Sequence, residues 1–260
     1  MKNNMRATAF QISKNVLLIY CCFLFSCSKS RTDENDLYSD QLKGAVLDAT
    51  FTFYDLVPIS PKKFGRSPDS KYSFHFNEQG NIVEQAEYVY KNNGFVISRL
   101  DEFTYNDEGQ RIFTFHGSHP NPYIKVSYEK GVTETDSLDE STGAILKKTL
   151  SISVNDTLST EQQLSPAGKN LGKVILQIKD GRVASYKVFN ENERQEAQYF
   201  FQYDRAYRIK SRIYSQNNKS DTLTYSYQHF DQHGNYLDAI TYYHGKPHVL
   251  EERILTYYKK

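Results

Sequence analysis

Hydrophobic and polar residues alternate along most of the chain between short polar turns. In residues 222–230 (TLTYSYQHF), Leu223, Tyr225 and Tyr227 fall on one face of an extended chain, and the residues between them fall on the other. Side chains of a β-strand point to opposite faces in turn, so this period of two predicts strands. The best helical candidate, residues 160–164, is one turn long.

An aromatic residue followed four positions later by glycine recurs along the chain. Complete copies begin at Phe76, Tyr90, Tyr105 and Phe230, and degenerate copies begin at Phe189, Tyr203 and Tyr214. Asn or Asp after the aromatic residue favours a type I turn, and glycine supplies the positive φ of a hairpin bulge. Short turns join antiparallel neighbours. The pattern predicts an all-β fold, an elongated antiparallel β-meander of repeated hairpins that forms largely a single sheet, open or partly curled.

These units resemble the YD repeat, or RHS-like repeat, whose pattern is Tyr-Asp-x-x-Gly-Asn/Arg-Leu/Ile. Repeat lipoproteins of Gram-negative bacteria are similar in four places, namely 42–46 (LKGAV), 230–236 (FDQHGNY), 245–247 (GKP) and 253–257 (RILTY). Tyr236 stands where that group has Trp. The resemblance covers residues 42–115 and 185–258, and residues 116–180 fit it poorly. It implies an architecture and a location in the cell envelope, but no activity.

The first 26 residues have the order of a secretory signal peptide. Three basic residues and no acidic residue precede the apolar run 16–25, which is followed by Ser26 and Cys27. A run of ten is too short for a membrane-spanning helix, which needs roughly 20 residues. Residues 24–27 (LFSC) resemble a bacterial lipobox, which implies that Cys27 is lipidated and begins the mature chain. The alternative is an ordinary cleaved signal, or an uncleaved anchor in which Cys27 is incidental.

The rest of the chain divides into a polar tether and one domain. Residues 27–44 are polar and form the expected tether, and residues 45–260 form the repeat domain with an irregular middle at 116–180. By resemblance the lipoprotein carries three acyl chains, and several chains hold a protein firmly on a membrane. Ser28 after the cysteine favours the outer membrane. We expect a lipid-anchored envelope protein that faces either the periplasm or the cell surface.

Charge and cysteine content exclude several classes of function. Without residues 1–26 the chain has 29 basic and 31 acidic side chains, a net charge of −2, and no basic block. Nucleic acid is therefore not an expected partner. Cys21 and Cys22 leave with the leader, so acylation of Cys27 leaves no thiol for a disulfide, a metal or nucleophilic catalysis.

Histidine pairs and one loop are the remaining polar candidates. The pairs are His116/His119, His229/His233 and His244/His248. They straddle turns rather than lie on a helix, so we expect exposed turn histidines, no metal and no cofactor. Residues 115–123 (FHGSHPNPY) are either a binding loop or a plain strand connection. The chain contains no motif of a hydrolase, phosphate loop or dinucleotide site, and we expect that it is not an enzyme.

Tyrosines supply the candidate binding face. Tyr225, Tyr227, Tyr242 and Tyr257 are expected on one face, as a platform for sugar rings or peptides. The alternative is that they are cross-strand pairs, each contributing about 0.2–1 kcal/mol to the sheet. The predicted function is a membrane-anchored binding or scaffolding module for glycan, peptidoglycan or protein. The alternative is an immunity or toxin-associated RHS-like accessory protein.

Overall fold

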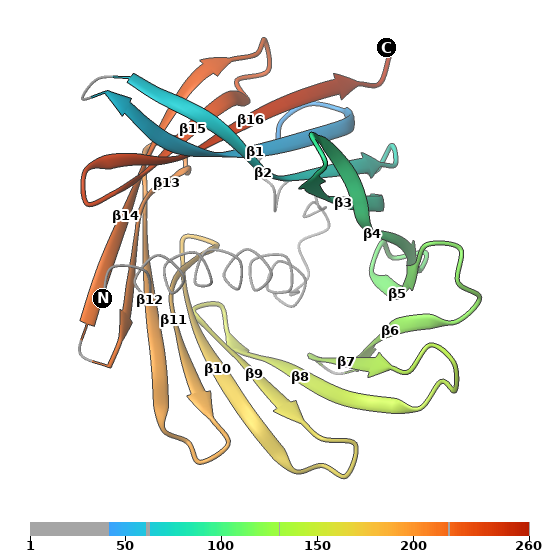
Figure 1. Ribbon diagram of the computed structural model, residues 1–260. Coiled ribbons are helices and arrows are strands. Elements are labelled where there is room, and N and C mark those ends of the chain that lie inside the picture. Colours follow the sequence, from blue (N-terminus) through green and yellow to red (C-terminus); the bar gives the residue numbers. More distant parts are fainter. Residues whose placement is uncertain (1–41, 61–62, 130, 218, 260) are drawn as a thin grey trace.

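The chain folds into a closed β-barrel (Figure 1). The computed structural model describes residues 42–60, 63–129, 131–217 and 219–259. Cys27 and the predicted signal peptide lie outside these residues, as does most of the predicted tether. Among the described residues there is no helix of the length and apolarity needed to cross a bilayer.

The strands of the described residues run in chain order around the barrel. They are β1 (Val46–Ser60), β2 (Lys63–Phe76), β3 (Ile82–Lys91), β4 (Gly94–Tyr105), β5 (Arg111–His116), β6 (Pro122–Glu129), β7 (Val132–Leu138), β8 (Ile145–Asn155), β9 (Leu158–Leu164), β10 (Asn170–Lys179), β11 (Arg182–Asn190), β12 (Gln195–Tyr203), β13 (Ile209–Gln216), β14 (Lys219–Phe230), β15 (Tyr236–Tyr243) and β16 (Lys246–Tyr257). Each strand pairs antiparallel with its neighbours in the sequence, and β1 pairs with β16.

Closure contradicts the predicted fold class. The prediction of an elongated single sheet, open or partly curled, is wrong, because β1 and β16 pair from Val46 with Tyr257 to Asp55 with Val249. Alternation and turn chemistry specify which strands are neighbours. They do not specify whether the first and last strands meet, which depends on strand tilt and stagger summed around the whole sheet. Closure also removes both exposed sheet edges along these residues.

Three segments that the repeat pattern does not cover also form strands. Residues 116–180, predicted to be irregular, contain the regular strands β6 to β10. The proline-containing residues 58–60 and 63–70 lie in the long β1–β2 hairpin, whose outer part extends beyond the pairing of β1 with β16. Residues 160–164, the helical candidate, belong to β9. In each case strand pairing with neighbours decides the conformation rather than local propensity.

The repeated turn is confirmed in its chemistry. Asn77 Oδ1 accepts hydrogen bonds from the backbone N–H groups of Gln79 (3.1 Å) and Asn81 (2.9 Å), and Gly80 follows at φ 81°. The same side-chain bonds recur at Asn106, Asn190, Asp204 and Asp231. The residues at positive φ in those turns are Gly109, Glu193, Tyr207 and Gly234. The copy at Tyr90 forms a different, tight turn, with Asn92 and Asn93 both at positive φ.

The abundant tyrosines tie neighbouring strands together. Tyr105 OH donates a 2.6 Å hydrogen bond to the carbonyl of Ile82, near the start of the preceding strand. Tyrosines of β6, β12 and β14 repeat this bond to the strand before each, in the pairs Tyr128–Arg111, Tyr203–Val183 and Tyr227–Ile209. A tyrosine ring packs on the sheet while its hydroxyl satisfies a backbone carbonyl. The repeated tyrosine therefore has a structural role at the strand end.

Buried side chains gather on one face of the sheet, which we assign to the barrel interior. One cluster includes Phe51 and Phe74, with ring centroids 5.2 Å apart. A second includes Tyr186 and Tyr199, whose rings stack at 4.3 Å. Strand register places them on a common face, because Ala49 pairs with Phe74 and Leu176 pairs with Tyr186. The inner face is therefore rich in aromatic residues, and it also carries charged ones, since Arg253 pairs with Phe51 and lies over its ring.

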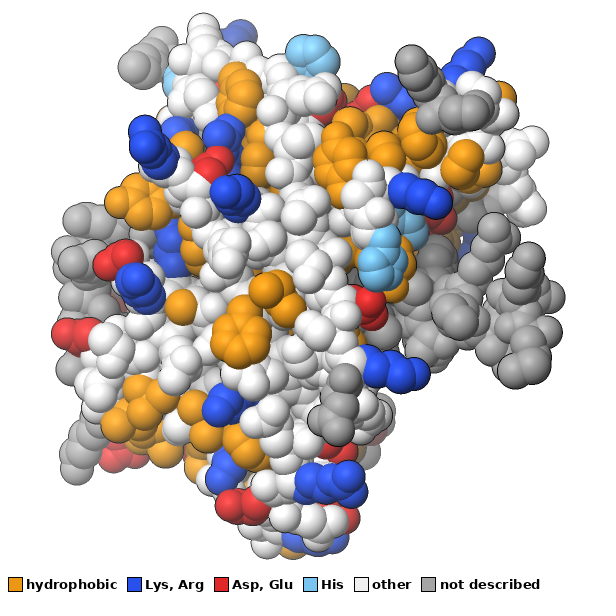
Figure 2. Space-filling view, turned by 90° about the vertical axis from the view of Figure 1, so that its left-hand side faces the viewer, with side chains coloured by type: hydrophobic (Ala, Val, Ile, Leu, Met, Phe, Trp, Pro, Cys, Tyr) orange, Lys and Arg blue, Asp and Glu red, His pale blue; other side chains and the backbone are white. Residues whose placement is uncertain are grey.

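The opposite, outer face carries charge. Lys71, Glu84 and Glu102 lie on it in β2 to β4 by register, and Lys148 and Glu252 lie on it in β8 and β16. Exposed apolar residues such as Ile152 and Ile254 lie between these charges. Figure 2 shows charged side chains scattered over one side of the barrel among small hydrophobic patches.

Asn235 links the start of the barrel to its last hairpins. Its Nδ2 donates to Lys43 O (2.9 Å) and to Tyr257 OH (2.9 Å), and its Oδ1 accepts from Lys43 N (2.7 Å). Asn235 is 3% exposed. The neighbouring Asp231 accepts a hydrogen bond from Tyr257 OH. Burial and this bond to Asp231 raise the pKa of Tyr257 to about 12.

We predict that Asn235→Ala lowers the free energy of unfolding by about 2–3 kcal/mol, because two backbone groups of Lys43 lose their partner. Urea unfolding followed by tyrosine fluorescence measures the change. Asn192→Ala, in an exposed turn, is the control and is expected to change stability by less than about 0.5 kcal/mol. Equal effects of the two substitutions would contradict a closing role for Asn235.

Candidate functional site

Antiparallel order divides the turns between two ends of the barrel. The entry end holds Leu42, the end of β16 and the turns that follow even-numbered strands up to β14. The far end holds the turns that follow odd-numbered strands, including the β5–β6 and β7–β8 loops. Successive turns of an antiparallel sheet alternate between its ends, so this division follows from topology alone.

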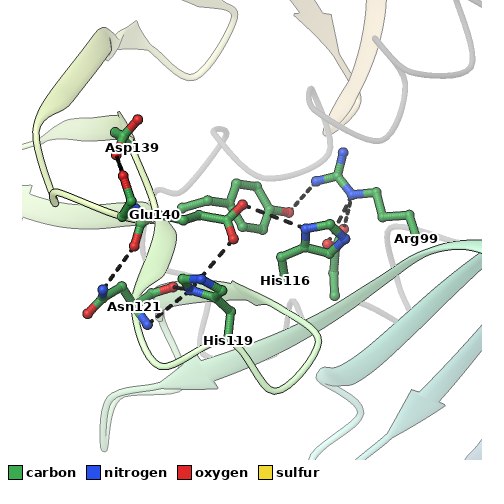
Figure 3. A network of polar contacts seen from close by, with 9 residues as sticks. Arg99, His116, His119, Asn121, Asp139 and Glu140 are labelled. Carbon is green, nitrogen blue, oxygen red and sulfur yellow. Dashed lines mark hydrogen bonds and ion pairs between the residues drawn. The ribbon is translucent and has the colours of Figure 1, made fainter.

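A polar cluster lies at the far end (Figure 3). We define the far-end cluster as Arg99 and Asp101 of β4, His116 of β5, His119 of the β5–β6 loop, Tyr123 of β6 and Glu140 of the β7–β8 loop. Register places Asp101 opposite His116. The two loops are joined by a 2.9 Å hydrogen bond from Asn121 Nδ2 to Glu140 O.

Arg99 is held by Asp101 and Tyr123. Its Nε donates to both oxygens of Asp101, at 3.0 and 2.8 Å, and its Nη2 donates to Tyr123 OH. Asp101 is buried, whereas the Arg99 side chain is 42% exposed. Burial disfavours the charge of Arg99, but the hydrogen bonds and charges of Asp101 and Tyr123 together outweigh it, and the net shift in the pKa of Arg99 is upward. Burial raises the pKa of Tyr123, so its hydroxyl stays protonated.

Glu140 lies between two histidines. Its Oε1 is 3.6 Å from His116 Nδ1, and its Oε2 is 3.6 Å from His119 Nδ1. The His116 and His119 side chains are 52% and 39% exposed. Among the described residues no group of three or more His, Cys, Asp or Glu side chains is arranged to hold a metal ion.

The cluster combines a guanidinium, two imidazoles, two carboxylates and an aromatic ring. The His116 and Tyr123 rings meet edge to face at 6.4 Å, and the Arg99 guanidinium carbon is 5.0 Å from the centre of the Tyr123 ring. Arg and imidazole N–H groups donate, and Asp and Glu accept. Such a set can hold a ligand that carries hydroxyl and carboxylate groups.

The four predicted tyrosines do not form one platform. Tyr225 and Tyr227 share the inner face, where Tyr227 packs on Tyr236 at 4.5 Å. Tyr242 lies on the other face, because its partner is Thr224. Tyr257 lies at the entry end, bonded to Asn235.

The other histidines do not converge either. His229 Nδ1 contacts Asp238, and His244 Nε2 lies 3.6 Å from Asp221. The His233 ring packs on Tyr257 at 4.4 Å.

Sequence reasoning found part of the far-end cluster. The candidate loop 115–123 contains His116, His119 and Tyr123. Arg99, Asp101 and Glu140 were missed, since nothing near them in the sequence distinguishes them from other charged strand and turn residues. Only the pairing of β4 with β5, and the meeting of two loops, brings them to the histidines.

Comparisons with known proteins supply no family. No family model matches the chain, and no curated protein matches it. Among solved structures, a porin-like protein from Bacteroides uniformis aligns with 82% of this chain and 99% of its own, at 10% identity and a TM-score of 0.45. A porin-like protein from Bacteroides vulgatus aligns with 84% of this chain and 100% of its own, at 10% identity and a TM-score of 0.39.

Likeness this distant carries no inference about what the chain binds or conducts. The resemblance to YD or RHS-like repeats is wrong, because no family model of such repeats matches the chain and the repeated hairpins close into a barrel. The turn motif and three short segments produced that resemblance, and any antiparallel hairpin can use the same turn.

Asp139 provides a test of the β7–β8 loop. Its Oδ1 accepts hydrogen bonds from the Ser141 hydroxyl (2.6 Å) and the Thr142 N–H (2.8 Å), which lower the pKa of Asp139 to about 2. A lowered pKa means that the bonds stabilise the folded loop above pH 4 and are lost as the pH falls towards 2. We predict that the Asp139 carboxyl carbon keeps its ionised NMR shift from pH 7 to pH 3.

Ser141→Ala is the matched variant. It removes the hydrogen bond that contributes most to the lowered pKa of Asp139. The pKa of Asp139 is therefore expected to rise, so that its titration falls within the measured pH range. Titration of Asp139 near pH 4 in the unaltered chain would contradict the loop geometry.

Proposed function

We propose that this chain is a lipid-anchored protein of the bacterial cell envelope that binds a carboxylate-bearing glycan, such as peptidoglycan, through the far-end cluster, without catalysis. The observation that carries the proposal is the cluster itself, in which Arg99 and His116 contact Tyr123 and Glu140 lies between the two histidines (Figure 3). The sequence of the leader supports the anchor at Cys27.

The charged side chains of the outer face favour a barrel that is surrounded by water rather than by lipid. A membrane-spanning barrel has an apolar outer band with aromatic girdles, and a Lys or Arg at its midplane costs about 2–4 kcal/mol. Here Lys71, Lys148 and Glu252 are among the charges on the outer face, and the aromatic clusters lie inside. We therefore assign membrane attachment to the lipid rather than to the strands.

The chemistry of the cluster favours a glycan. Sugar rings present apolar faces that pack on aromatic rings and hydroxyls that bond to carboxylates and guanidinium groups. Peptidoglycan also carries carboxylates, which suit Arg99 and the two imidazoles. The toxin-associated alternative rested on the RHS resemblance and is dropped with it.

The anchor is tested by Cys27→Ser. We predict that this variant moves from the membrane fraction to the soluble envelope fraction without detergent, because the charged outer wall has no favourable place in hydrocarbon. Fractionation with immunoblotting measures the shift. A variant of Ser28, which leaves the cysteine in place, controls for altered export. Retention of Cys27→Ser in the membrane would refute the anchor and favour an embedded barrel.

The ligand is tested by co-sedimentation of the Cys27→Ser protein with insoluble peptidoglycan. We predict that His119→Ala combined with Glu140→Gln weakens binding about tenfold, the effect of losing one or two hydrogen bonds to charged groups. His244→Ala, an exposed histidine at the same end, is the control and should bind as the parent does. Parent-like binding by the double variant, or no binding by the parent, would remove this function.

A further inference from the structure

We propose that two neighbouring turns at the entry end dock on the anionic phospholipid headgroups of the bilayer that holds the anchor. The entry-end patch consists of Lys179 and Arg182 at the β10–β11 turn and Arg205, Tyr207 and Arg208 at the β12–β13 turn. The proposal rests on the lipid anchor of the proposed function for its setting, and it adds a second contact with the membrane.

Tyr207 occupies a position that favours glycine. Its φ is 63°, where the equivalent turns of the entry end have Gly80, Gly109 and Gly234; the equivalent turn of the far end has Glu193. A bulky residue in the left-handed region is strained, and such strain is a pointer to function. The side chain is also 55% exposed, so burial does not explain the choice. The Arg182 guanidinium lies 5.1 Å from the centre of the Tyr207 ring.

The turns at the entry end differ in net charge. Residues 179–182 and 203–208 contain four basic and two acidic side chains, a net charge of +2. One of the acids, Asp204, is paired with Arg208 at 2.7 Å. At the same entry end, the β2–β3 and β4–β5 turns carry Glu78, Asp107 and Glu108 and no basic residue. Arginine and lysine beside an exposed tyrosine match the chemistry of an anionic membrane surface.

The tether does not by itself orient the barrel. Fifteen residue steps separate Cys27 from Leu42, which span at most about 50 Å when extended. A strand of about ten residues tilted in a barrel gives a height of roughly 25 Å. The chain could therefore present either end to the bilayer. Docking of the patch fixes the entry end against the membrane and turns the far-end cluster away from it.

The test uses the full mature chain with Cys27→Ser, so that no acyl group contributes. Sedimentation with vesicles of equal parts phosphatidylethanolamine and phosphatidylglycerol measures binding at low salt. We expect binding that falls with added salt. Lys179→Gln with Arg205→Gln should weaken it roughly 25-fold, about fivefold for each charge. Lys91→Gln with Lys125→Gln removes the same charge from the far end and the outer wall and should leave it unchanged.

Tyr207→Gly separates docking from folding. Glycine relieves the strained conformation, so the thermal midpoint should stay equal or rise while vesicle binding falls. Parent-like binding by Tyr207→Gly, equal weakening by the control pair, or equal binding to pure phosphatidylcholine vesicles would overturn the proposal. Because no acyl chain or glycan is present, failure here leaves the Cys27 fractionation and peptidoglycan results untouched, and the two proposals fail separately.

Discussion

The pairing of β1 with β16 is the constraint on which the rest of the structure depends. Every other pair of strands is joined by a short connection, so its pairing requires only local chain reversal. The β1–β16 ladder joins Val46 to Tyr257 across nearly the whole domain, at the largest loop-closure cost in the fold. Side chains reinforce it, since Asn235 holds Lys43 and the Tyr258 hydroxyl donates to the carbonyl of Phe76 at 2.6 Å.

The local half of the fold could be predicted from sequence. Asn77 and Gly80 specify their turn by hydrogen bonding and positive φ, and period-two alternation specifies the strands around it. The middle of the chain was harder, because its turns use other chemistry. The β7–β8 turn is organised by Asp139, which bonds Ser141 and Thr142, with no aromatic residue at the repeat position. Closure and the far-end cluster depend on contacts between distant residues, for which a single sequence contains no signal.

Strand register explains why the four candidate tyrosines do not share one face. Tyr225 faces Thr241 across the β14–β15 ladder, and Tyr242 faces Thr224. A register different by one residue would have placed Tyr242 opposite Tyr225 and both on the inner face. Alternation within each strand was predicted correctly, but the offset between strands is set by turn length and by bulges such as the one between Thr241 and Tyr242 in the pairing with β16. Periodicity identifies the faces of a strand and leaves open which faces combine.

The polarity of the barrel determines where partners can act. The outer wall carries charges such as Lys71 and Glu252, and the buried aromatic clusters and tyrosine hydroxyls of the inner face hold strands together. What remains is the chemistry of the two ends, and they differ. The entry end combines a strained, exposed Tyr207 with basic turns, and the far end combines His116, His119 and Glu140 between two loops. Because antiparallel order places these groups at opposite ends of the wall, one closed sheet holds the two sets of side chains apart.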